Sequence, residues 1–208
     1  MNLRIAAALA FSLAAIASPV AAAQLGGMGA AIYGNAFSFK KANLDTVPVQ
    51  SIEVGGLKVV LQRTKLKDIQ KVLGGTIQRQ GEGASRADWL CYAGGGQNVW
   101  FIANSLGGYE FVMMVAAEAS GKAAGGCDAS DKLGALKFGI PGLGASSAEL
   151  KTAFGAAPAK SGKVSYRADE PGADALGTAM NAQYIGYTLA GGKVTGIGIG
   201  ETSVQMAK

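Results

Sequence analysis

A hairpin-like stretch occurs twice in this chain and limits what it can fold into more than any other feature. The first copy spans residues 97–115 (QNVWFIANSLGGYEFVMMV), and the weaker second copy spans residues 183–199 (QYIGYTLAGGKVTGIGI). In both copies apolar residues alternate on either side of a Gly-Gly pair, which is typical of two antiparallel strands joined by a tight turn. Each half of the chain is therefore expected to contain an antiparallel sheet.

Two shorter segments recur upstream of each hairpin, in the same order. Residues 57–61 (LKVVL) correspond to residues 136–140 (LKFGI), and residues 69–74 (IQKVLG) correspond to residues 150–155 (LKTAFG). Several landmarks that recur in one order with a slowly changing spacing indicate an internal duplication.

A short amphipathic helix is predicted before each hairpin. In the first half, Thr64 is the expected N-cap and Gly74 the expected C-terminal stop, with the basic residues of 65–71 on the outer face. In the second half, Ser146 and Glu149 have the spacing of a capping box. A helix of this kind must bury its apolar stripe against a sheet. In the first helix that stripe comprises Leu66, Ile69, Val72 and Leu73.

These elements predict an α+β fold with two tandem units, each a short helix packed on a small antiparallel sheet. The first unit is expected to span residues 48–119 and the second residues 133–208. A linker rich in glycine, alanine and serine joins them at residues 120–132. Residues 24–47 are interpreted as a flexible leader, and residues 169–178, which contain glycine, proline and acidic residues, as a loop.

The first 23 residues have the pattern of a secretory signal peptide. Arg4 supplies the positive start, an apolar core follows, and Ala21–Ala23 form a small-residue cleavage site. The apolar run is too short and too interrupted for a transmembrane anchor. No cysteine lies near the cleavage site, so no lipid anchor is expected. The sequence therefore predicts export, to the periplasm or beyond.

The two cysteines, Cys91 and Cys127, are predicted to form a disulfide, because an exported chain meets an oxidising compartment. A reactive cysteine would need a base or a positive neighbourhood to lower its thiol pKa. The chain has no histidine and no CxxC motif, so the structural interpretation is favoured.

The net charge of +5 is spread along the chain. A nucleic-acid-binding surface would show a basic stripe with aromatic residues between the charges, and none is visible. Basic residues concentrate only at Lys40-Lys41 and in residues 63–71, which leaves a peripheral contact with an anionic envelope surface as a hypothesis. Without histidine or an acidic loop of EF-hand spacing, no metal site and no cofactor are expected.

The two hairpins differ in their faces. Both faces of the first are apolar, whereas one face of the second is rich in glycine and threonine. One short helix covers only one face of a small sheet, so part of the first apolar surface must meet something else. An exposed apolar patch would be a binding site; the alternatives are burial against the leader, burial against the glycine-rich face, or exposure of the opposite face. The predicted binding face comprises Trp100, Ile102, Val112 and Met114.

The order of elements resembles the architecture of the β-lactamase-inhibitor proteins. The matching features are a helix ending in Leu73-Gly74 or Phe154-Gly155, an aromatic strand at Trp89–Tyr92 or Val164–Tyr166, and a hairpin turning at Gly-Gly. A single unit is also similar to the small outer-membrane-assembly lipoproteins of the SmpA/OmlA (BamE) type, although their lipid-anchoring cysteine is missing. The resemblance covers about residues 48–203 and implies a protein-binding scaffold whose sheet faces its partner. No contact residue of those families is carried over.

The sequence therefore favours a non-catalytic exported module that binds or inhibits a protein partner through a sheet face. An envelope assembly factor that contacts an anionic membrane surface is the alternative. A hydrolase is the weakest hypothesis, because it would depend on carboxylates alone. The candidate carboxylates are Glu82, Asp88 and Glu110.

Overall fold

The computed structural model describes residues 24–34, 36–155, 160–174 and 177–205. The predicted signal peptide lies outside these residues. The three helices described are α1 (Gly27–Tyr33), α2 (Leu66–Leu73) and α3 (Ser147–Phe154), with 3₁₀ turns at Gly83–Ser85 (η1) and Ser105–Gly107 (η2). The strands are β1 (Ile52–Val54), β2 (Leu57–Val59), β3 (Gln78–Gln80), β4 (Ala87–Gly94), β5 (Gln97–Asn104), β6 (Met114–Ala119), β7 (Asp128–Ala129), β8 (Gly162–Asp174), β9 (Gly177–Ala190) and β10 (Lys193–Gln205).

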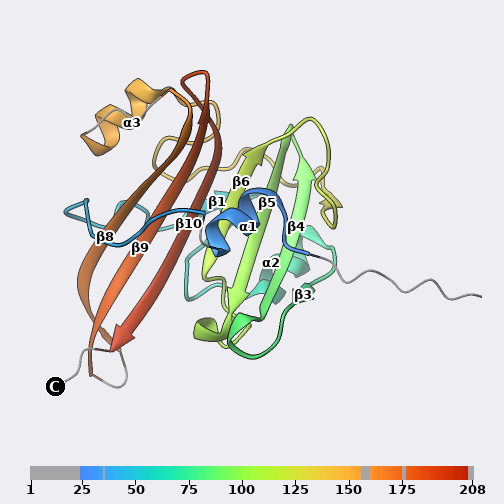
Figure 1. The fold of residues 1–208 in the computed structure, drawn as a ribbon. Helices are drawn as coiled ribbons and strands as arrows, with labels where there is room; N and C mark the ends of the chain where they lie inside the picture. Colours follow the sequence, from blue (N-terminus) through green and yellow to red (C-terminus); the bar gives the residue numbers. More distant parts are fainter. Residues whose placement is uncertain (1–23, 35, 156–159, 175–176, 206–208) are drawn as a thin grey trace, which may run out of the picture.

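One large sheet runs through the molecule, in the order β3-β4-β5-β6-β10-β9-β8 (Figure 1). The short strand β7 pairs with β4 in parallel. The predicted fold class, two units each with its own small sheet, is therefore wrong, although the α+β composition is confirmed. The join lies between β6 and β10, where Val115 pairs with Ile199 and Ala116 with Gly198. Separate sheets would have left both strands with an edge of unpaired backbone groups, and the antiparallel pairing satisfies them.

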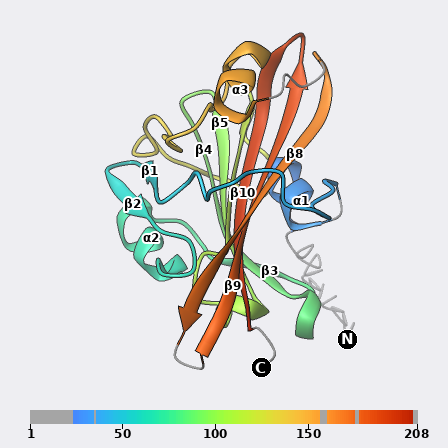
Figure 2. The same ribbon diagram turned by 90° about the vertical axis from the view of Figure 1, so that its left-hand side faces the viewer.

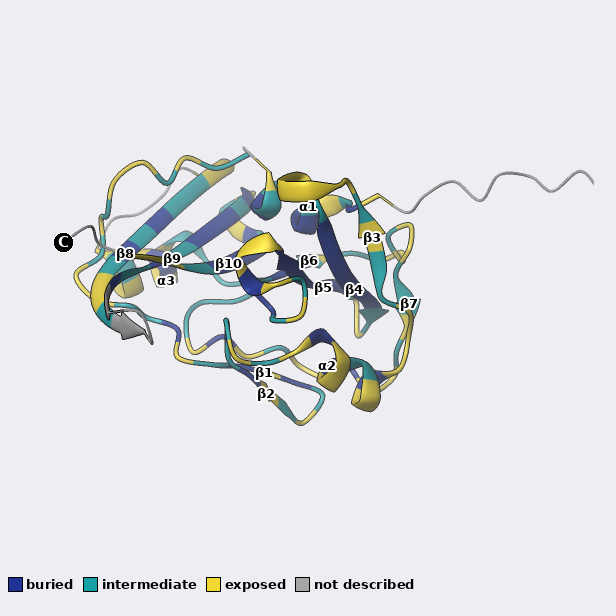
Figure 3. Ribbon diagram, turned by 90° about the horizontal axis from the view of Figure 1, so that it is seen from below, coloured by how far each residue is buried: buried dark blue, intermediate teal, exposed yellow. Residues whose placement is uncertain are grey.

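The sheet is covered on both faces. Figure 3 shows α1 on one side of it and α2 with the β1–β2 hairpin on the other. The larger core lies on the side of α2, α3 and the hairpin, and includes Leu66, Leu150 and Tyr187. The smaller core lies under α1 and includes Trp89 and Trp100. Within the described residues, no helix has both the length and the apolar character needed to cross a bilayer.

Local signals for the two core-covering helices hold well. The capping box of α3 is confirmed: the Glu149 amide donates to Ser146 Oγ at 3.2 Å, and the Ser146 amide donates to Glu149 Oε2 at 2.8 Å. The N-cap predicted for α2 at Thr64 is wrong: the N-cap is Lys65, and the Thr64 hydroxyl accepts from the Val60 amide instead. Leu66, Ile69 and Leu73 are buried as predicted, whereas Val72 is 40% exposed.

The turns of the two predicted hairpins differ. The second turns tightly at Gly191-Gly192, both with positive φ, and its strands pair from Lys193 and Ala190 to Gln205 and Ala179, with one register shift between Val194 and Gly196. In the first, Gly107 and Gly108 belong to or cap η2, and β6 begins only at Met114. The residues between them leave the sheet, and the main chain of Val112 bonds instead with Thr64 and Gln62 beside α2.

The loop predicted at residues 169–178 is wrong for the part that the structure describes. β8 continues to Asp174 and β9 begins at Gly177, so the two strands extend the sheet at its edge. Pro171 can stand in β8 because its position faces outward: Arg167, four residues earlier, directs its N–H and C=O to Asn43 rather than to β9. Proline there removes a donor from the exposed edge and blunts it.

The leader contains helix α1, which the sequence did not indicate. The Met28 amide donates to Glu118 Oε2 at 2.9 Å, and the Leu25 amide donates to Gln80 Oε1 at 2.7 Å. A side chain at Gly198 would collide with Ile32, since an added Cβ would lie 2.7 Å from the Ile32 Cβ. The leader helix α1 thus packs against the glycine-rich face of β10.

The predicted disulfide between Cys91 and Cys127 is confirmed. Cys91 lies on β4, and Cys127 directly precedes β7, within the predicted linker. The bond fastens this linker against β4, where β7 adds a short parallel pairing with Tyr92 and Ala93. A disulfide is compatible with an oxidising compartment outside the cytoplasm.

Candidate binding groove

The four residues of the predicted binding face do not form one surface. Trp100 and Ile102 are fully buried in the smaller core, covered by α1, and Met114 is half-buried beside them. Val112 is buried in the larger core on the other side of the sheet. Alternation along one continuous strand predicts Val112 and Met114 on the same face, but Val112 precedes β6, so this alternation does not apply to it. Of the alternatives, cover by the leader is the arrangement found.

The proposed catalytic carboxylates are not gathered into one cleft. Glu110 is exposed and pairs with Lys65 at 2.8 Å, beside the start of α2. Glu82 precedes η1 in an exposed loop. Asp88 is buried on β4 and held by two arginines. The described residues also contain no group of three or more His, Cys, Asp and Glu side chains arranged to hold a metal ion.

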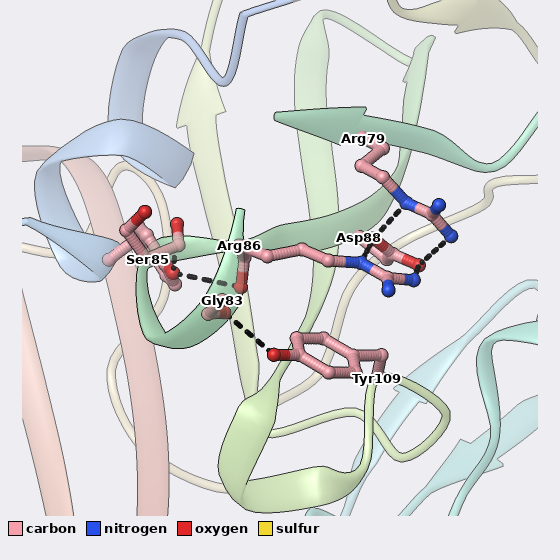
Figure 4. A network of polar contacts seen from close by, with 7 residues as sticks. Arg79, Gly83, Ser85, Arg86, Asp88 and Tyr109 are labelled. Atoms are coloured by element: carbon pink, nitrogen blue, oxygen red, sulfur yellow. Dashed lines mark hydrogen bonds and ion pairs between the residues drawn. The ribbon is translucent and has the colours of Figure 1, made fainter. Parts of the chain in front are cut away.

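Asp88 forms the most extensive ion-pair network in the described part of the chain (Figure 4). Arg79 donates to it from Nε and Nη2 at 2.9 and 3.0 Å, and Arg86 donates from Nε and Nη2 at 2.8 and 2.6 Å. Burial alone would raise the pKa of Asp88, but the hydrogen bonds and positive charges of the two arginines outweigh it and lower the pKa to about 2. The carboxylate is therefore ionised and fully engaged.

Aromatic side chains fix this network in place. The Arg86 guanidinium lies 4.1 Å from the ring centroid of Tyr109, whose hydroxyl donates to the Gly83 carbonyl at 2.7 Å. From the leader, the Tyr33 hydroxyl reaches the carbonyls of Ser85 and Arg86 at 3.1 and 3.2 Å. These contacts tie the loop around η1 to both faces of the molecule. The arrangement fastens the edge of the sheet.

A groove lined by charged and amide side chains lies at the other end of the sheet. It has a volume of about 380 Å³. Its floor consists of Glu170, Asn181 and Glu201, one each from β8, β9 and β10. Its walls are the segment 47–52 and the end of the β1–β2 hairpin at residues 58–63.

The floor is built from two rows of side chains that cross the three strands. In one row, Gln183 lies opposite Ala168 and Glu201; in the next, Asn181 lies opposite Glu170 and Ser203. Residues two apart on a strand share a face, so both rows continue the face that carries Ile185 in the larger core. The face thus changes from apolar to polar toward the ends of the strands.

The first row already holds a piece of extended chain. Gln183, 1% exposed, accepts from the Val49 amide at 3.0 Å and donates to the Val49 carbonyl at 2.8 Å. Its Nε2 also donates to Glu201 Oε2 at 3.1 Å, and Gln62 donates to Glu201 Oε1 at 2.7 Å. We call the two bonds between Gln183 and Val49 the amide clamp. Figure 2 shows the clamped segment crossing β9 and β10 instead of running along them.

The second row is open to the groove. Asn181 is half-buried, and its Oδ1 lies 2.7 Å from the Ser203 hydroxyl, which also lies 2.9 Å from Gln62 Oε1. Glu170 is exposed, and it has no ion-pair partner among the described residues. Both side chains are thus accessible to a ligand in the groove.

Sequence reasoning used Gln183 only as a landmark. Both hairpin copies open with glutamine, and both of these side chains bind the main chain of a crossing segment: Gln97 donates to the Gly134 carbonyl at 3.0 Å. The sequence signal for this role is a glutamine beside apolar strand residues at the start of each hairpin. Comparison with family models, curated proteins and solved structures gives no match for this chain. The resemblance to inhibitor and assembly proteins stays a prediction.

Proposed function

We propose that this protein is an exported, non-catalytic binding protein that holds an extended segment of a partner polypeptide in the groove over β8, β9 and β10. The amide clamp carries this proposal. A side-chain amide that both accepts from and donates to one residue's main chain recognises extended polypeptide whatever its sequence. Gln183 does this for Val49, with both bonds between 2.8 and 3.0 Å.

The open row offers the same chemistry to another chain. Asn181 carries the same amide group, two residues along β9 and on the same face. Positions two apart on a strand are separated by about 6.7 Å. A partner segment crossing the strands beside residues 47–50 would therefore lie along the row of Glu170, Asn181 and Ser203.

The state of the nearby carboxylates favours binding over catalysis. Glu201 accepts hydrogen bonds from the amides of Gln62 and Gln183. A carboxylate occupied in this way is held as a structural acceptor and is poorly placed to take a proton from a substrate. The proposal keeps the predicted binding role and moves it from the covered face of β5 to the open end of β8–β10.

The alternative of an envelope factor touching anionic lipid has less support. Two of the basic residues in the α2 region are paired with acidic neighbours, Lys65 with Glu110 and Lys71 with Asp68. Exposed pairs of this kind reduce the field available to attract a membrane. A peripheral contact with an anionic surface, and location in the periplasm, stay predictions.

A display library of random peptides tests the groove directly. Purified mature protein is expected to enrich peptides that bind in extended form, and Asn181→Leu is expected to weaken the binding of these peptides about tenfold, because Leu cannot bond a main chain. Thr202→Val, on the outward face of the neighbouring β10, is the matched control and should leave binding unchanged. Equal binding by wild type and Asn181→Leu, with both folded, would reject the groove as the site.

A further inference from the structure

The charges around the groove are divided between its two sides. Glu170 stands on β8, while Lys58 and Arg63 stand on the hairpin wall. All three are exposed, and none of them forms an ion pair with another described residue. The fourth charge, Glu201, is occupied by its two amide partners. The neutral amides do not cancel the charge of Glu201, so the groove has two negative charges, of which only Glu170 is without partners in the described part of the chain, and two unpaired positive charges.

The position of Gln62 shows where the positive wall lies over the sheet. Its side chain bonds Glu201 and Ser203, both on β10, so the neighbouring Arg63 also belongs to the β10 side. Glu170 lies two strands away, on β8. Neighbouring strands are about 4.8 Å apart, so β8 and β10 are about 10 Å apart, and the opposite charges lie at the two sides of this span. An extended chain covers this distance in about three residues.

This division selects against uniformly charged ligands. A polyanion, such as a cluster of lipid headgroups, would meet Glu170 at one end of the row. A polycation would meet Arg63 and Lys58 at the other. A ligand with one charge of each sign satisfies both ends, and charge complementarity of this type mainly sets specificity and orientation.

We propose that the groove takes an extended polypeptide segment with a basic residue over Glu170 and an acidic residue over Arg63, two to four positions apart. This inference rests on the proposed function and adds the partner's charge pattern and its direction across the sheet. The segment can bind in only one direction, because turning it round would place like charges together at both ends.

The test uses short extended peptides and measures their Kd for the mature protein. One peptide carries a basic residue three positions before an acidic residue, a second carries the reverse order, and three others carry two basic, two acidic or two neutral residues there. Wild type is expected to bind one of the two mixed orders about three- to tenfold more tightly than each of the other four, as exposed charge pairs allow.

Reversal of the groove charges supplies the decisive comparison. The double variant Glu170→Lys, Arg63→Glu is expected to prefer the opposite mixed order, and added salt should remove the preference in both proteins. Lys163→Glu, outside the groove on the same strand as Glu170, is the control and should keep the wild-type preference. Thermal unfolding checks that each variant is folded.

The two proposals fail differently in this experiment. Binding of all five peptides with equal Kd would overturn the charge pattern and leave the groove as a polypeptide site. Mixed peptides preferred in the same order by wild type and the double variant would also overturn it. Absence of binding by every peptide, including those enriched from the random library, would overturn both proposals.

Discussion

At the scale of single residues, the molecule uses buried polar side chains to hold main chain and edge strands in place. Gln183 bonds both main-chain groups of Val49, and Asp88 accepts from four guanidinium nitrogens. Buried polar groups are tolerated only when they are satisfied. Gln183 finds its partner 134 residues away and so fixes a long-range contact. Asp88 finds its partners nine and two residues away, on β3 and just before β4, and so fixes the edge of the sheet.

Asp88→Asn is expected to lower the free energy of unfolding by about 2 kcal/mol at pH 7. The lowered pKa of Asp88, about 2 against an ordinary 3.8, corresponds to stability that is complete above about pH 4 and is lost as pH falls toward 2. Urea unfolding between pH 2 and pH 7 measures it, and the variant should lose that part of the pH dependence.

Glu110→Gln is the matched control for Asp88→Asn. Glu110 also pairs with a basic residue, but both partners are largely exposed to solvent. Exposed pairs contribute little to stability, so a much smaller loss is expected. Equal losses of stability in the two variants, or an Asp88→Asn protein with the wild-type pH profile, would contradict the role assigned to the buried network.

At the scale of elements, the leader helix packs closely on β10 because glycines there have no side chains in the way. Ile32 and Met28 of α1 lie against Gly198 and Gly196 of β10, and Gly29 lies against the Trp100 ring. A helix of 7 residues that begins with a glycine and contains a second one has little stability of its own. Its order must come from close packing on the sheet, which glycine on both sides permits.

Gly198→Val is expected to displace α1 while leaving the sheet folded. An added Cβ would lie 2.7 Å from the Ile32 Cβ, closer than packed atoms allow, and β10 is held in place by strands on both of its edges. Hydrogen exchange should rise at residues 27–33, and tryptophan emission should shift to the red as Trp89 and Trp100 lose their cover. Gly121→Ala, where an added Cβ meets nothing, is the control. Unchanged protection of α1 in Gly198→Val would refute the claim that close packing on the β10 glycines keeps α1 ordered.

At the scale of the whole molecule, long-range links hold the two halves of the chain as one body. β6 and β10 join the sheet, and Gln183 and Glu201 fasten the segment 47–62 across its far half. The disulfide between Cys91 and Cys127 attaches the segment between β6 and α3 to β4. The groove depends on this assembly, since its floor and walls come from segments more than a hundred residues apart.

Removal of the disulfide is expected to lower the free energy of unfolding by about 4 kcal/mol. The bond links cysteines 36 residues apart, and the chain-entropy relation gives this value for a loop of that length. Urea unfolding of Cys91→Ala, Cys127→Ala should be compared with oxidised and reduced wild type. The reduced protein should resemble the variant, and the variant should not respond to reductant. A reduced protein as stable as the oxidised one would contradict the prediction.

The sequence by itself determined the local features of this protein. Three of these features follow from residues that are close together in the sequence: the turn at Gly191-Gly192, the capping box at Ser146 and the strand containing Trp89–Tyr92. The fourth, the disulfide, follows because the sequence has only two cysteines and so only one possible pair. Each depends on backbone preference or on simple elimination, which a linear pattern records.

Only the tertiary structure decided how these pieces combine. Three contacts depend on which surfaces meet: the pairing of β6 with β10, the cover of Trp100 by α1, and the amide clamp between Gln183 and Val49. Alternation predicts that a strand has two faces but not what covers either one, because burial is a property of the assembled layers. The groove followed from that assembly: its site residues are ordinary polar side chains until the sheet brings them into one row.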